Sequence, residues 1–287
     1  MKPDTPFVGS DRDSLIRLAR AMGRVDAMAF DVDGTLADAS SYVPKSTISA
    51  LARLANAGVQ PVIITGRVYP AASKILHDAH CPGIVVASNG AVVGDCETDE
   101  ILYQHPMEPE FSRGLIDLGR KHDLSITLFL FDSMVSDRDD FSARFLKDAN
   151  EGLAVRIEDI DQIDPDLILK IMYAHPDPQV LDQLTPELLE QFPDLQRSLN
   201  NYFEIVSPGE GKKKALHIVA DKLGWDLERV AGFGDGGNDV HWMPETGWPI
   251  AVENARDEVK AIARGVIGHH NHGGVENFID AYLHVHG

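Results

Sequence analysis

The sequence predicts an α/β fold, a doubly wound parallel sheet interrupted by an inserted α+β unit. Two observations support this prediction. Short apolar segments alternate with amphipathic helical segments over residues 25–91 and again over residues 201–287. Between them, over residues 92–200, strand-like and helix-like segments follow one another without that rhythm. Apolar strands separated by helices are typical of a parallel sheet that is covered on both faces.

The first part of the sheet is expected within residues 1–91, after a helical extension over residues 1–24. Here the apolar segments have strand length, and the segments between them repeat their apolar residues with a helical period. We expect three strands and two helices, at residues 25–30, 59–65 and 83–88 and at residues 46–57 and 70–79.

The chain is expected to return to this sheet at residue 201, so the second part of the core covers residues 201–287. The alternation resumes with residues 201–209, and further strands are expected at residues 229–235, 248–252 and 265–268. Right-handed crossovers would place the loops that follow the parallel strands at one edge of the sheet, where they form a ligand crevice.

Charge and cysteine content narrow the function classes. The chain has 26 Lys and Arg against 45 Asp and Glu, a formal net charge of -19. Such a surface repels nucleic acids and anionic membranes, so we expect a small-molecule partner. We expect the protein to be either a monomer or a homodimer. Two cysteines without paired spacing favour a reduced, cytoplasmic protein. No apolar stretch is long enough to predict a membrane span or a signal segment.

Two aspartates end the first predicted strand, in the segment "DVDGTL". Asp31 and Asp33 are two residues apart, so in an extended chain they face the same side. Two ionised carboxylates that close repel each other unless a cation lies between them, and Mg²⁺ prefers oxygen ligands. The alternative is a plain Asp-Gly turn between strands.

A second acidic cluster follows a later strand, in "GFGDGGNDV". It supplies Asp235, Asn238 and Asp239 in a glycine-rich turn. Residues 232–237 also match the G-x-G-x-x-G fingerprint of dinucleotide-binding proteins. That reading is disfavoured, because Asp235 would place a negative charge at the pyrophosphate and the strand lies late in the chain.

Two further segments could hold an anion. Thr65 and Gly66 end the second strand, where a hydroxyl and a free backbone N–H can contact phosphate oxygens. Lys212 begins a predicted helix in "GEGKKKAL", and helix N-termini favour anions. Since strand ends share one crevice in a doubly wound sheet, we expect these groups and the aspartates to meet.

The motifs "DVDGTL", "ITGR", "SNGA", "KKKAL" and "GDGGNDV" resemble those of the haloacid dehalogenase superfamily, specifically its Cof-like branch of small-molecule phosphatases. The resemblance extends over nearly the whole chain from about residue 25. It implies a Rossmann-like core with an inserted cap domain at residues 92–200 that closes over the site.

The resemblance also implies the roles of the site residues. Asp31 would be the nucleophile that becomes an aspartyl phosphate, and Asp33 the general acid and then base, lending its main-chain carbonyl to the metal. The groups implied to hold the phosphoryl group are Thr65, Gly66, Lys212 and Asn238, and those implied around Mg²⁺ are Asp31, Asp33, Asp235 and Asp239. Lys213 stands where the family has glycine, so the phosphate contact falls to Lys212 or Lys213.

These roles predict a Mg²⁺-dependent phosphatase that hydrolyses a small phosphorylated metabolite, with a sugar phosphate as the first expectation. A carboxylate attacking a phosphate is repelled unless a cation neutralises the charge between them. One alternative is a phosphomutase that forms the same aspartyl phosphate. Another is a binding or regulatory protein that keeps the fold without catalysis, which the complete set of aspartates disfavours.

Overall fold

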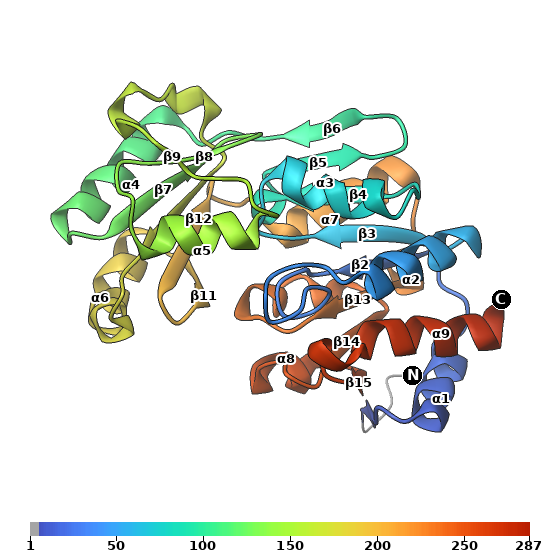
Figure 1. Ribbon diagram of the computed structural model, residues 1–287. Helices are drawn as coiled ribbons and strands as arrows, with labels where there is room; N and C mark the ends of the chain where they lie inside the picture. Colours follow the sequence, from blue (N-terminus) through green and yellow to red (C-terminus); the bar gives the residue numbers. More distant parts are fainter. Residues whose placement is uncertain (1–5) are drawn as a thin grey trace.

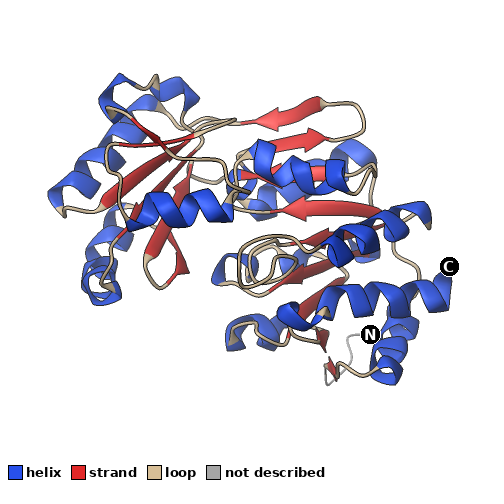
Figure 2. Cartoon of the chain, viewed as in Figure 1, coloured by secondary structure: helices blue, strands red, loops and turns tan. Residues whose placement is uncertain are grey.

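The computed structural model describes residues 6–287 and consists of two sheets with their own helices (Figure 1). The larger, nine-stranded sheet has the order β1-β15-β14-β13-β2-β3-β4-β5-β6, and the smaller, six-stranded sheet has the order β11-β12-β10-β7-β8-β9. Figure 2 shows helices (blue) on both sides of the larger sheet (red), which is the covered α/β arrangement that the sequence predicts.

The larger sheet and its helices form the core domain. Its parallel strands are β1 (Phe7–Val8), β2 (Ala27–Phe30), β3 (Gln60–Ile64), β4 (Ile84–Ala87), β13 (Val230–Gly234), β14 (Trp248–Val252) and β15 (Gly265–Ile267). Its antiparallel strands are β5 (Val92–Asp95) and β6 (Glu100–Gln104). Its helices are α1 (Arg12–Met22), α2 (Lys45–Asn56), α3 (Tyr69–Asp78), α7 (Lys212–Leu223), α8 (Asp257–Ile262) and α9 (Gly274–His286).

The smaller sheet forms the cap domain, at the upper left in Figure 1. Its strands are β7 (Ser125–Phe129), β8 (Met134–Ser136), β9 (Arg156–Ile157), β10 (Lys170–Ala174), β11 (Gln196–Leu199) and β12 (Tyr202–Val206). Its helices are α4 (Pro109–Lys121), α5 (Phe141–Ala149) and α6 (Pro178–Gln191). Most of its neighbouring strands run antiparallel, and an apolar cluster of its own lies between this sheet and its helices.

The boundaries of the cap differ from the prediction of residues 92–200. β5 and β6 turn back antiparallel beside β4, so the core sheet continues to Gln104. β12 pairs with β10 and β11, so the cap sheet continues to Val206. An apolar run predicts a strand but not the sheet edge that it joins, because that choice depends on partners far away in the chain.

Within the predicted N-terminal extension, residues 1–24, the described residues 6–24 are part of the core domain. β1 pairs in parallel with β15 at the sheet edge, and α1 packs against α9. The apolar side of α1, with Leu15 and Leu18, is buried in the main core. Residues 1–5 of the extension lie outside the described residues.

Candidate active site

The carboxyl ends of two adjacent core strands bring the first and second acidic motifs together. β2 and β13 pair in parallel with Phe30 opposite Phe233, and their rings stack with centroids 4.7 Å apart. The backbone N–H of Asp31 then donates to the carbonyl of Phe233 at 2.9 Å. Asp31 and Asp235 therefore leave the sheet side by side, although 204 positions separate them in the chain.

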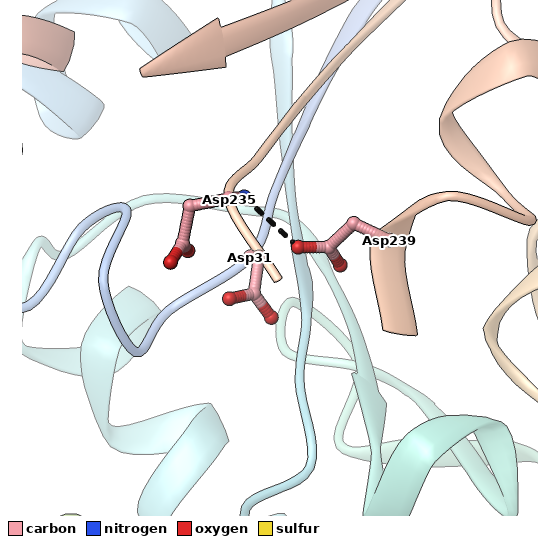
Figure 3. Close-up of side chains that lie close together, drawn as sticks. All are labelled: Asp31, Asp235 and Asp239. Atoms are coloured by element: carbon pink, nitrogen blue, oxygen red, sulfur yellow. Dashed lines mark hydrogen bonds between the residues drawn. The ribbon is translucent and has the colours of Figure 1, made fainter. Parts of the chain in front are cut away.

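Three carboxylates gather at this edge, from Asp31, Asp235 and Asp239 (Figure 3). One oxygen of each lies within 4.8 Å of the others, and Asp31 is only 6% exposed. Burial and the neighbouring Asp239 raise the pKa of Asp31 well above its usual range. The same two causes raise the pKa of Asp235 to about 7. The ionised cluster is thus unfavourable by itself, and a hard divalent cation with oxygen ligands would stabilise it.

The carboxylates of this cluster differ in their freedom to bind a metal. Asp239 is fully buried, and its Oδ2 accepts hydrogen bonds at 3.0 Å from the backbone N–H groups of Asp235 and Gly236. Its Oδ1 accepts from the Lys212 ammonium and the Trp242 indole, both at 2.8 Å. With these four donors, Asp239 is better placed to hold Lys212 and the turn after β13 than to bind a metal directly.

The other two carboxylates are the better candidates for metal ligands. Asp31 accepts from Lys212 through Oδ1, and Asp235 accepts from the Thr35 hydroxyl through Oδ1 at 2.8 Å. Gly34 packs directly under Asp235, where a Cβ atom would come 2.3 Å from Asp235 Oδ2. The donor set at this edge fits a Mg²⁺ ion held chiefly by Asp31 and Asp235.

The first of the three consecutive lysines reaches the site. Lys212 Nζ lies 2.6 Å from Asp31 Oδ1, and the side chain is buried at the start of α7. Burial alone would lower the pKa of Lys212, but Asp239 and Asp31 raise it above its usual range, so the group is cationic. Lys213 instead pairs with Glu245 at 2.6 Å, with its side chain half exposed. The geometry therefore distinguishes the two lysines and favours Lys212.

The remaining phosphate-binding candidates lie around the same edge. Thr65 directly follows β3 and is 1% exposed, and its hydroxyl accepts the backbone N–H of Arg67 at 3.3 Å. Gly66 and Asn238 both line the cavity in front of the carboxylates. All the side chains and turns that the sequence predicted for the site are thus placed at one end of the core sheet.

Asp33 is held apart from the carboxylate cluster. Its carboxylate pairs with Arg67 twice, Oδ1 with Nη2 at 2.7 Å and Oδ2 with Nε at 3.2 Å. Its side chain lines the cavity and is 46% exposed. The carboxylate of Asp33 therefore points toward the substrate space rather than toward the predicted metal, and a metal contact through Asp33 would use the main chain.

The sequence suggested no functional role for Arg67, which was noted only as part of the "ITGR" turn. The guanidinium is 2% exposed, which is unusual for a charged side chain. One feature of the sequence could have indicated a role: a positive residue just beyond a buried strand, in a chain with a strongly negative net charge.

A buried polar cluster that the sequence analysis missed joins cap and core. Lys170 on β10 is 1% exposed, and its Nζ lies 2.6 Å from Glu204 Oε2 on β12. Lys170 also donates to the carbonyl of Gly66 at 2.7 Å, and Asn89 of the core donates to Glu204 at 2.7 Å. The signal was one charged residue inside each apolar strand, Lys170 in "LILKIMY" and Glu204 in "YFEIV".

A cavity of about 130 Å³ lies between the two domains. Its core side presents Asp31, Asp33 and Asp235. Its cap side is largely apolar and includes Phe129, Phe145, Leu146, Ala149, Met172, Leu199 and Tyr202. With a cation bound among the carboxylates, this arrangement would suit a ligand with an anionic group at one end and a less polar group at the other. None of the helices in the described part of the chain has the length and apolar character needed to cross a membrane.

Comparisons with known proteins agree with this architecture. The family model for haloacid dehalogenase-like hydrolases matches residues 28–279. The chain is 26% identical over 270 residues to pyridoxal phosphate phosphatase YbhA of Escherichia coli strain K12, covering 89% of this chain and 98% of that protein. It is also 26% identical over 281 residues to 5-amino-6-(5-phospho-D-ribitylamino)uracil phosphatase YwtE of Bacillus subtilis strain 168, covering 89% and 97%.

A solved structure extends the comparison to the fold. The crystal structure of a haloacid dehalogenase-like hydrolase from Bacteroides thetaiotaomicron superposes with a TM-score of 0.80 at 22% identity, covering 90% of this chain and 99% of that one. The family model spans both core segments and the cap, and the relatives are named as phosphatases. The chain therefore belongs to the haloacid dehalogenase-like hydrolase family, in its Cof-like phosphatase branch.

Proposed function

We propose that this phosphatase hydrolyses a small phosphate monoester in a Mg²⁺-dependent reaction through an aspartyl phosphate on Asp31. The observation that carries the proposal is the position of Asp31. Its carboxylate lies at the cavity surface, paired with Lys212 at 2.6 Å and clustered with Asp235. A nucleophile with one fixed cation and a second cation site beside it can approach an anionic substrate.

In the first step an oxygen of Asp31 attacks phosphorus, and the bond from phosphorus to the leaving oxygen breaks. Asp33 gives its proton to that oxygen, so the leaving group departs as an alcohol. Asp33 then takes a proton from the water that attacks the aspartyl phosphate, which releases inorganic phosphate and regenerates Asp31. Bound Mg²⁺, held by Asp31, Asp235 and the Asp33 carbonyl, would supply charge neutralisation between the carboxylate and the phosphate.

The phosphoryl oxygens need partners during both steps. Lys212 supplies a positive charge, and Thr65, Gly66 and Asn238 supply neutral hydrogen-bond donors. Such donors act where charge develops in the transition state. Gly66 and Asn238 line the cavity, and Lys212 contacts Asp31, which also lines it; these positions support the proposed roles.

The leaving group has two candidates. A sugar phosphate remains the prediction from the sequence. A phosphate ester of a flat heterocyclic alcohol is favoured by the cap side of the cavity, where Phe145 and Tyr202 stack with ring centroids 4.8 Å apart beside Met172. Apolar and aromatic walls bind flat rings well. Pyridoxal phosphate, named for one relative, is an ester of this kind.

Phosphate release tests the proposal. Purified protein would be assayed with sugar phosphates, pyridoxal phosphate, nucleotides and alkyl phosphates, with Mg²⁺ and with a chelator. We expect release from at least one ester, lost with the chelator and lost in Asp31→Asn. Full activity of Asp31→Asn would remove the aspartyl phosphate, and full activity in chelator would remove the metal. Interconversion of phosphorylated isomers with little release of phosphate would favour the mutase.

A further inference from the structure

A residue of the cap reaches the proposed acid through one buried arginine. Arg67 Nη1 lies 3.0 Å from Glu151 Oε1, while its Nη2 lies 2.7 Å from Asp33 Oδ1. Glu151 belongs to the cap and lies two residues after the end of α5. Arg67 and Asp33 belong to the core. The three side chains form a continuous line of charge from the cap to the substrate cavity.

The acceptors around Arg67 hold its guanidinium in one orientation. Nε and Nη2 donate to the two oxygens of Asp33, and Nη2 also donates to the carbonyl of Ser41 at 2.7 Å. Nη1 is directed to Glu151, the acceptor that the cap contributes. Because the guanidinium is almost completely buried, loss of the Glu151 acceptor would leave the Nη1 donor without its partner, and that cost favours a reorientation of the guanidinium that also shifts the Asp33 carboxylate.

The cap presents Glu151 in a specific way. Its backbone has φ of 57°, a left-handed conformation that costs free energy for a residue with a side chain. The preceding Asn150 accepts the backbone N–H of Val68 at 3.0 Å, beside Arg67, and donates to the carbonyl of Leu146 in α5. The side chain of Glu151 is only 14% exposed. The docked cap therefore directs this carboxylate toward Arg67.

We propose that Glu151 is a positioning residue for Asp33, acting through Arg67, so that docking of the cap orients the group that protonates the leaving alcohol. The proposal rests on the proposed function, since it takes Asp33 as the acid. A purely structural role for Glu151 as a cap–core contact is the alternative. The two differ in the first step, where an acid matters only when the leaving group needs a proton; in the second step Asp33 serves as base whatever the ester.

The experiment compares leaving groups. One substrate is an alkyl phosphate that the wild type hydrolyses, whose alkoxide must be protonated. The other is 4-nitrophenyl phosphate, whose phenolate leaves without a proton. In single-turnover measurements of leaving-group release, which report the first step alone, Glu151→Ala should slow release from the alkyl ester about 10- to 100-fold and from the nitrophenyl ester by no more than about twofold. Glu151→Gln keeps an acceptor oxygen for Nη1 and should restore most of the loss.

Asp148→Asn is the matched control, because it removes an exposed carboxylate from α5, the helix that precedes Glu151. It should leave both rates unchanged within about twofold. If Glu151→Ala does not fold, Glu151→Asp, with its carboxylate one methylene shorter, makes the same comparison. Thermal unfolding of each variant confirms that it is folded.

Each outcome decides the proposal. A loss confined to the alkyl ester, with recovery in Glu151→Gln, supports it. Equal losses on both esters indicate a structural contact and overturn it, as does an unchanged alkyl rate in Glu151→Ala. Inactivity of the wild type toward every ester, or full activity of Asp31→Asn, would overturn the proposed function and this inference with it. The two failures are therefore distinguishable.

Discussion

The ammonium group of Lys212 lies 2.6 Å from Oδ1 of Asp31, and both side chains are buried. The same ammonium contacts Asp239 at 2.8 Å. Lys212 therefore does two things at once. It offsets part of the repulsion among the carboxylates, and it keeps a positive charge beside the atom that would attack the phosphate.

Replacing Lys212 should mainly reduce the rate of the chemical step. We expect Lys212→Met to lower kcat about 100- to 1000-fold, the usual cost of removing one group that stabilises developing charge. Steady-state phosphate release at saturating substrate measures it. Lys213→Met is the control, because Lys213 is exposed and pairs with Glu245. If the two variants lose activity equally, the assignment of Lys212 is wrong.

Replacing Asp235 should stabilise the metal-free protein and weaken its binding of Mg²⁺. In chelator, Asp235→Asn should raise the free energy of unfolding, because it removes one of three like charges. With Mg²⁺, the variant should bind the ion at least about tenfold more weakly than wild type. Calorimetric titration with Mg²⁺ and denaturant unfolding in chelator measure the two effects. Asp221→Asn, on the exposed side of α7, serves for comparison and should change neither. An unaltered Mg²⁺ affinity in Asp235→Asn would contradict the metal site.

Gly34 should be required for the position of Asp235. Its φ is 85°, and a Cβ atom there would come 2.3 Å from Asp235 Oδ2. Gly34→Ala should therefore displace the carboxylate and weaken Mg²⁺ binding at least about tenfold.

The control for this substitution is Gly58→Ala. Gly58 has nearly the same φ, 82°, but among the described residues no atom lies within 4 Å of its added Cβ. Both variants bear similar backbone strain, and only one disturbs the site. Equal Mg²⁺ affinities in calorimetric titration would show that the close approach of Gly34 to Asp235 has no consequence.

Removing Lys170 alone should destabilise the protein more than removing the charges of Lys170 and Glu204 together. Lys170→Met leaves Glu204, whose side chain is only 12% exposed, without its cation and should lower the free energy of unfolding by about 3–5 kcal/mol. Lys170→Met combined with Glu204→Leu removes both charges and should recover most of that loss. Denaturant unfolding of the two variants and the wild type measures the difference. A double variant no more stable than the single one would mean that the contacts to Gly66 and Asn89 dominate instead.

The sequence alone was sufficient for the position of Asp31, the proposed nucleophile. Asp31 and Asp235 each follow an apolar run, and the carboxyl ends of adjacent parallel strands meet at one edge of a sheet. Since that rule depends only on local strand pattern and chain handedness, the meeting of distant acidic groups could be predicted, as could the core fold and the presence of an inserted cap.

Tertiary structure decided which side chains serve those groups. Arg67 could not be linked to Asp33 or Glu151 from their positions in the chain, because the contact requires the cap to dock in one orientation. The pairing of β5 and β6 with the core likewise followed from the edge left open beside β4. Local pattern determines what each segment becomes, whereas long-range packing determines which segments meet. At this site the meeting of Asp31 and Asp235 follows from the first, and the contacts that orient Asp33 follow from the second.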